Sequence, residues 1–143
     1  MELDAILAQA DTNPATKRVP VTFDAKGDPE SGFIIVSRES EQFRAESKRQ
    51  RIAGVRRGAV KKSQIDTKTD AGAEQLVDLI DENELGIARA VVVDWFGFTR
   101  GDKPAKFDRA TADAVLAKKH GWRAAVIAAL DDEAGFLSAQ PAS

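Results

Sequence analysis

Apolar residues recur along this chain at two spacings, and each spacing predicts a kind of element. Residues 19–23 and 33–36 are short runs rich in β-branched and aromatic side chains. The stretch AKGDPESG between them contains the Gly, Pro and Asp that are typical of turns. We therefore expect a β-hairpin over residues 19–36. Two strands alone are only marginally stable in water, so the hairpin must pack on another element or pair with a second copy.

The longest helical pattern lies between residues 70 and 96. A second helix is expected over residues 38–62, but its apolar stripe is thin, and Gly54 and Gly58 each cost about 1 kcal/mol relative to Ala within a helix. The helix expected over residues 70–96 has the wider apolar face, which is formed by residues three, four or seven apart: Leu76, Ile80, Ile87, Val91 and Trp95.

Two shorter helices are expected over residues 108–119 and 122–138. Residues 1–18 read as a flexible N-terminal arm and residues 139–143 as a disordered tail. The whole pattern predicts a mainly α fold, with one small helical domain over residues 19–138 that carries an N-terminal β-hairpin.

The net charge of the 143 residues is only −2, but the charges are unevenly distributed. Residues 38–62 contain nine basic and three acidic side chains, whereas residues 63–95 contain eight acidic and two basic ones. Successive segments of opposite charge attract each other within a chain or between copies. The residues that we expect to act between subunits are Arg49, Arg56, Arg57, Glu74, Asp78 and Asp81.

Few residues have the chemistry that catalysis needs. The chain lacks cysteine and has one histidine, His120, so the usual zinc sites and a Ser-His-Asp or Cys-His pairing have no support. The acids at residues 131–133 are adjacent and point in different directions on a helix, as expected of a solvated face. The glycines of RIAGVRRGAVKK lack the order of a phosphate-binding loop. We expect no enzymatic activity, no metal and no cofactor.

Targeting signals are also missing. The acidic N-terminal stretch has no basic region followed by a long apolar run, and no segment approaches the roughly 20 apolar residues of a membrane span. The expected location is the cytoplasm, which suits a chain without cysteine.

The run VVVDWFGF raises the question of whether its aromatic residues bind a partner or fill a core. Trp95 and Trp122 each lie on the apolar face of an expected helix, so we expect them to pack together. The other aromatics near them cannot all point the same way. The residues that we expect to contact a partner are Phe96, Phe98, Phe136 and Leu137.

The basic helix over residues 38–62 permits an alternative function, because nine cations could contact several phosphates of a nucleic acid. Only Phe43 is interleaved with them for stacking, and the following segment is acidic, so a protein partner is favoured.

The last 60 residues combine VVVDWFGF, the turn TRGDKPAK, the helix start FDRATADAVL and a final helix ending DDEAGFL. Together with the hairpin and the segment SRESEQFRAESKRQR, this order resembles the tail assembly chaperones of long-tailed, non-contractile bacteriophages. The resemblance covers roughly residues 19–138. It leaves open a second alternative function, that of a structural tail or connector subunit of such a bacteriophage.

The resemblance implies a non-enzymatic protein that works in the cytoplasm of the host bacterium. Such chaperones bind the long, apolar tape measure protein and keep it soluble before the tail tube polymerises. A longer product, made by ribosomal frameshifting, often recruits the tail tube protein in this family. Coating a long partner requires many copies, so a homo-oligomer is expected.

Overall fold

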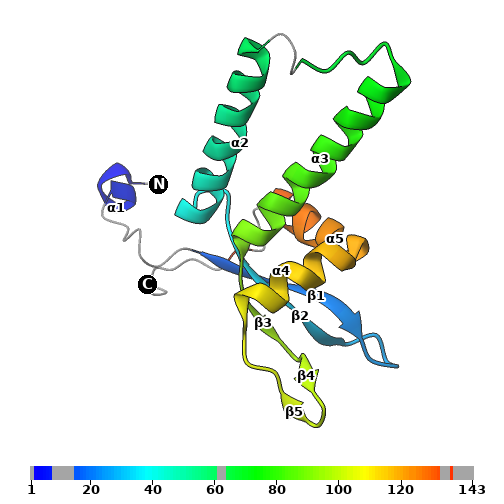
Figure 1. Cartoon of the computed structure of the whole chain (residues 1–143). Helices are drawn as coiled ribbons and strands as arrows, with labels where there is room; N and C mark the ends of the chain where they lie inside the picture. Colours follow the sequence, from blue (N-terminus) through cyan, green and yellow to red (C-terminus); the bar gives the residue numbers. More distant parts are fainter. Residues whose placement is uncertain (1, 8–14, 61–63, 133–135, 137–143) are drawn as a thin grey trace.

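The structure, a computed structural model, describes residues 2–7, 15–60, 64–132 and 136. Five helices and five strands occur in this part of the chain (Figure 1). In chain order they are α1 (Leu3–Leu7), β1 (Thr16–Phe23), β2 (Pro29–Val36), α2 (Glu41–Ala59), α3 (Asp70–Val91), β3 (Val92–Phe96), β4 (Thr99–Arg100), β5 (Lys103–Pro104), α4 (Arg109–Lys118) and α5 (His120–Asp131).

The expectation of a mainly α fold is wrong, because β1, β2 and β3 form an antiparallel sheet in that order and the fold is mixed α/β. The helix expected over residues 70–96 ends at Val91, and the chain enters β3 directly. Three consecutive valines at residues 91–93 favour the extended backbone. The edge of β2 supplies the hydrogen-bonding partners that β3 needs, with Phe33 opposite Trp95.

β1 and β2 form the hairpin, with Val19 opposite Phe33. Its turn is held by the Asp24 carboxylate, which accepts hydrogen bonds from the backbone N–H groups of Lys26 and Asp28 at 2.8 and 2.9 Å. β1 begins at Thr16, so residues 16–18, which we expected to belong to a flexible N-terminal segment, are part of the sheet. The support that an isolated hairpin lacks comes from β3 and from α5, which packs on β1 and β2.

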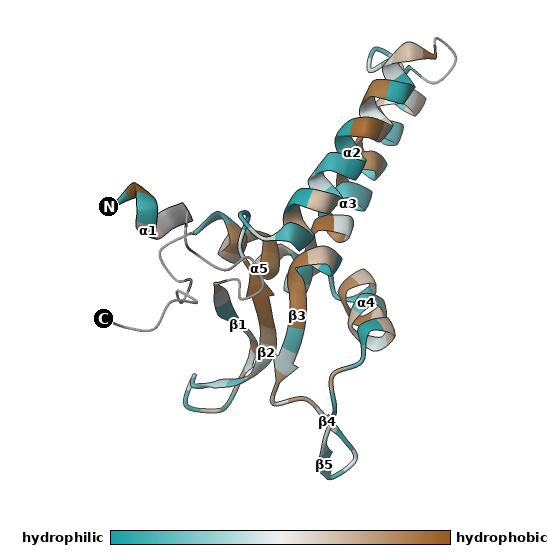
Figure 2. Cartoon of the chain, turned by 90° about the vertical axis from the view of Figure 1, so that its left-hand side faces the viewer, coloured by the Kyte–Doolittle hydropathy of each residue, from teal (hydrophilic) through white to brown (hydrophobic). Residues whose placement is uncertain are grey.

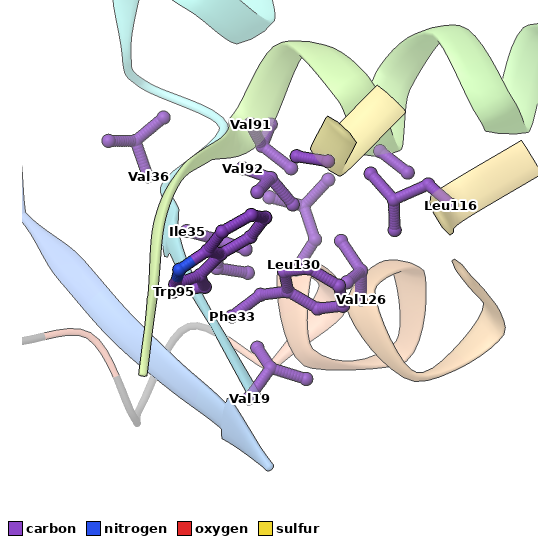
Figure 3. Packing of buried hydrophobic residues seen from close by; sticks show 12 residues of the cluster. Val19, Phe33, Ile35, Val36, Val91, Val92, Trp95, Leu116, Val126 and Leu130 are labelled. Atoms are coloured by element: carbon purple, nitrogen blue, oxygen red, sulfur yellow. The ribbon is translucent and has the colours of Figure 1, made fainter. Parts of the chain in front are cut away.

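The core lies between one face of the sheet and helices α3, α4 and α5 (Figure 3). β2 contributes Phe33 and Ile35, which are completely buried, and α5 contributes Val126 and Leu130. The buried apolar residues of the described chain are Val19, Phe33, Ile35, Val36, Ala88, Val91, Val92, Trp95, Ala112, Leu116, Val126 and Leu130.

The remaining helices start close to the expected positions, but α5 ends at Asp131, seven residues before the expected end at residue 138. α2 begins at Glu41, because Ser40 is its N-cap and accepts a hydrogen bond from the backbone N–H of Phe43 at 3.1 Å. α5 begins at His120, two residues before the expected start. Parts of the expected 38–62 and 122–138 helices, and the whole expected tail, lie outside the described residues: 61–63, 133–135 and 137–143.

Candidate interaction surface

α2 and α3 form a helical hairpin that stands out from the sheet and from α4 and α5, and we call it the arm (Figure 1). The two helices meet through polar contacts. The side-chain amide of Gln50 donates to the carbonyl of Asn83 at 2.9 Å, and Glu46 lies against Gly86, where a Cβ would collide with its carboxylate. No residue of α2 is buried. The arm is therefore held together by far less apolar packing than the core.

Most of the large apolar side chains that the described chain exposes are on the arm. Figure 2 shows apolar positions, in brown, along both of its helices. Their exposed fractions lie between 37% and 74%. Exposed apolar residues that are gathered on one element mark contact surfaces more often than scattered ones do. The group consists of Ile52, Val55 and Val60 around α2, and Leu76, Val77 and Ile80 on α3.

The two helices of the arm carry opposite charge. α2 has six basic and two acidic side chains, and α3 has six acidic and one basic side chain. In the described part of the chain no salt bridge joins α2 to α3, although the helices pack against each other. Arg49 instead pairs with Glu46 on its own helix. Most of the charge of the arm is therefore not paired between its two helices.

The Arg49 hydrogen bond lowers the pKa of Glu46, partial burial opposes this shift, and the hydrogen bond from Gln50 adds to it. Glu46 therefore stays ionised at the base of the arm.

The charged residues singled out from the sequence are divided between two environments. Arg57 and Asp78 line the same shallow hollow between the helices, together with Leu79. Arg56, Glu74 and Asp81 are exposed on the arm. One basic and one acidic candidate thus line the same hollow, where Asp78 is also exposed, and the other three are exposed elsewhere on the arm.

The aromatic candidates lie on different sides of the sheet. Phe98 is half-buried on the core side, with its ring centroid 5.5 Å from those of Trp95 and Phe33 and 5.7 Å from that of Trp122. Phe96 is the strand partner of Gly32 in the pairing of β3 with β2. Its ring lies on the opposite face of the sheet, where the Arg18 guanidinium is 4.2 Å from the ring centroid.

The last two partner-binding candidates lie near the C-terminus. Phe136 packs against the core and has the Lys17 ammonium 5.5 Å from its ring centroid, while Leu137 lies outside the described residues. Phe96 is thus the only one of the described aromatic candidates that does not pack against the core.

The acids near the end of α5 have structural partners. Lys17 donates to the backbone carbonyls of Ala129 and Asp132 at 3.1 and 2.9 Å and pairs with the Asp132 carboxylate at 3.3 Å. Arg38 pairs with Asp131. These contacts tie α5 to β1 and to the start of α2. No group of metal-ligating side chains occurs in the described ranges.

His120 stands at the start of α5, where the buried Arg123 guanidinium donates to its Nδ1 at 2.8 Å. This contact is local to one helical turn and assembles no nucleophile. Among the described helices none is long and apolar enough to cross a membrane.

Sequence reasoning missed Val55, Val77, Arg51 and Glu84 as surface candidates. They are exposed along the same arm as the charges that it found. Arg51 and Val55 are four residues apart, and Val77 and Glu84 are seven apart, so each pair shares one side of its helix. The side of the arm on which each pair lies depends on how α2 meets α3.

Comparison of the chain with models of protein families, with curated proteins and with solved structures finds no match.

Proposed function

We propose that this protein is a non-enzymatic tail assembly chaperone of long-tailed, non-contractile bacteriophages, which binds and solubilises the tape measure protein in the host cytoplasm. The observation that carries the proposal is the arm, a pair of long helices that exposes apolar side chains away from the core. An amphipathic helical surface is suited to a helical, apolar partner, because such partners dock by side chains spaced three or four residues apart.

The opposite charges of α2 and α3 support self-association as part of this function. Many copies are needed to cover a long partner, and an arm with one basic and one acidic helix can pair with its own copies. Recruitment of the tail tube protein by a longer, frameshifted product completes the proposal, and it rests on the family resemblance alone.

Co-expression tests the proposed function. The tape measure candidate is the product of the long coding frame that the resemblance places beside this gene, and it is expressed in bacteria with and without the protein. We expect the candidate to be insoluble alone and to move into the soluble fraction, bound to the protein, on co-expression. A candidate whose solubility does not change on co-expression would reject the function.

Nucleic-acid binding is the second candidate, because the six cations of α2 are not engaged in salt bridges to α3 in the described part of the chain. The acidic α3 beside them opposes the approach of phosphates. Its test is a DNA-binding titration between about 50 and 200 mM salt, over which contacts to several phosphates lose affinity steeply. We expect no DNA binding at physiological salt.

A further inference from the structure

We propose that two copies of this protein pair through one flank of their arms, with α2 of each copy packed against α3 of the other around a twofold axis parallel to the arms. This pairing deepens the self-association in the proposed function, on which it rests, by assigning it a surface and a symmetry. Four features of the arm carry it: the position of the apolar residues, the charges, the register of the helices and the space at two glycines.

The apolar residues gather on one flank. Gln50 on α2 contacts Asn83 on α3, and farther along the arm Arg57 and Leu79 line the same hollow. These residues mark the sides by which the two helices face each other. Each residue of an α-helix is rotated by about 100° around the helix axis from the residue before it. On α2, Gly54 and Gly58 are therefore rotated by roughly 40–90° from the side that faces α3. On α3, Leu76 and Ile80 are rotated from the side that faces α2 by a similar angle, in the same direction when each helix is viewed from its N-terminus. In antiparallel helices, equal rotation places residues on the same flank of the pair.

This flank, which we call the pairing flank, is open in the single chain. A Cβ built at Gly54 or Gly58 would have no atom within 4 Å. Val55 and Val77 lie at its outer rims and are 74% and 57% exposed. The pairing flank thus offers a shallow surface over the glycines beside a ridge formed by Leu76 and Ile80.

Charge selects the orientation of the second copy. If a second arm lay on the pairing flank with its direction reversed, the basic α2 would face α2 and the acidic α3 would face α3. If both arms point the same way, a twofold axis along them places each basic helix against an acidic one. Since like charges in contact are destabilising, the second arrangement is the favoured one. It also makes neighbouring helices antiparallel, as in a four-helix bundle.

The register makes this flank complementary to itself. Gln50 is level with Asn83, and Glu46 with Gly86, so residues of α2 and α3 whose numbers add to about 133 are at the same height. A twofold axis along the arm preserves height. The Ile80 side chain of the second copy therefore comes to the level of Gly54, and its Leu76 side chain to the level of Gly58. Neither glycine has a Cβ that would block them.

The charged rim has the same complementarity. Arg51 and Glu84 are exposed, lie on the pairing flank and are level with each other on the two helices. Across the axis, Arg51 of each copy faces Glu84 of the other, and the pair forms twice. Val55 meets Val77 of the second copy in the same way. Ile52 and Val60 lie on the other side of α2 and stay available for a tape measure protein.

Charge exchange tests the pairing by sedimentation equilibrium at low salt. The unchanged protein is expected to be a dimer. Arg51→Glu and Glu84→Arg are each expected to weaken dimerisation about tenfold or more, because each change alters two exposed pairs. The double variant is expected to recover most of the affinity. Arg56, which the sequence suggested as an intersubunit residue, lies on the opposite flank, so the pairing predicts no contact for it. The dimer of Arg56→Glu, which makes the same charge change, is expected to stay within about threefold of the unchanged protein.

Apolar variants give a second, independent readout. Ile80→Ser is expected to weaken the dimer and Ile52→Ser to leave it intact, with the helix content of both unchanged by circular dichroism. A protein that is monomeric at low salt, an Arg56→Glu variant as weak as Arg51→Glu, or a double exchange that restores nothing would overturn the pairing.

The pairing and the proposed function fail in different ways. A monomeric protein that still solubilises the tape measure candidate overturns the pairing alone. A dimer with the expected variant behaviour that leaves the candidate insoluble upholds the pairing and overturns the function.

Discussion

Phe98 packs against Trp122, with ring centroids 5.7 Å apart and an interplanar angle of 32°. Trp95 also packs against Phe98, with ring centroids 5.5 Å apart, so Phe98 connects the two tryptophans that the sequence led us to expect in direct contact. The aromatic run after α3 therefore mainly fills the core. The β3 strand makes this possible by turning Trp95 and Phe96 to opposite faces of the sheet.

Phe98→Ala is expected to lower the free energy of unfolding by about 3 kcal/mol, because it removes a ring that packs on three other rings. Phe96→Ala is the matched control, since Phe96 lies on the other face and mainly contacts Arg18, and its expected cost is about 1 kcal/mol. Urea denaturation measures both. Equal costs for the two variants would show that the aromatic packing described here is wrong.

Gly97→Ala is expected to destabilise the protein more than Gly101→Ala. Both glycines have positive φ, 76° and 61°, so both changes carry a conformational penalty of about 1–2 kcal/mol. At Gly97 a Cβ would also collide with the carbonyl oxygen of Glu30 and lie 2.9 Å from the Cα of Ser31, whereas at Gly101 it meets no atom within 4 Å. Thermal unfolding of the two variants gives the comparison, and a Gly101→Ala variant that is the less stable one would contradict it.

The acid sensitivity of the arm is expected to depend on Glu46. Its pKa in the folded protein is lowered, with the Arg49 hydrogen bond as the main cause, so its contribution to stability is present above the ordinary value of 4.5 and is lost as the pH falls through the folded value. The stability difference between the unchanged protein and Glu46→Gln should be largest at about pH 6–7 and smallest at about pH 3.

Urea denaturation across this pH range measures the difference. Glu39→Gln, which alters an exposed carboxylate before α2, is the control. A Glu46→Gln difference that stays constant with pH would rule out the ionised form of Glu46 as its source.

The sequence identified the elements whose local signals agree with the final structure. The hairpin was readable because Gly27, Asp28 and Pro29 are turn residues between two β-branched runs. The end of α3 could not be predicted from the sequence. Val91 and Trp95 are four residues apart, as on one face of a helix, but Val91, Val93 and Trp95 are also two apart, as on one face of a strand. Pairing with β2 decides between them, and that contact is distant in sequence.

The interaction surface was predictable only in its charge. The excess of cations on α2 and of acids on α3 is visible in the composition, but the flank on which each residue lies is set by the contact of Gln50 with Asn83 and of Glu46 with Gly86. Arg56 and Arg51 look equivalent in the sequence. Five residues of helix separate them by about 140°, which places them on opposite flanks of the arm.

Site-specific photo-cross-linking tests the central claim, that the arm binds the tape measure protein, most directly. A photoreactive residue replaces Ile52 on the arm or, as the control, Asp24 in the turn between β1 and β2, both of which are exposed. Each variant is co-expressed with the tape measure candidate, irradiated and examined by mass spectrometry. Cross-links to the tape measure protein are expected from position 52, and few or none from position 24. Cross-links from position 24 with none from position 52 would contradict the claim.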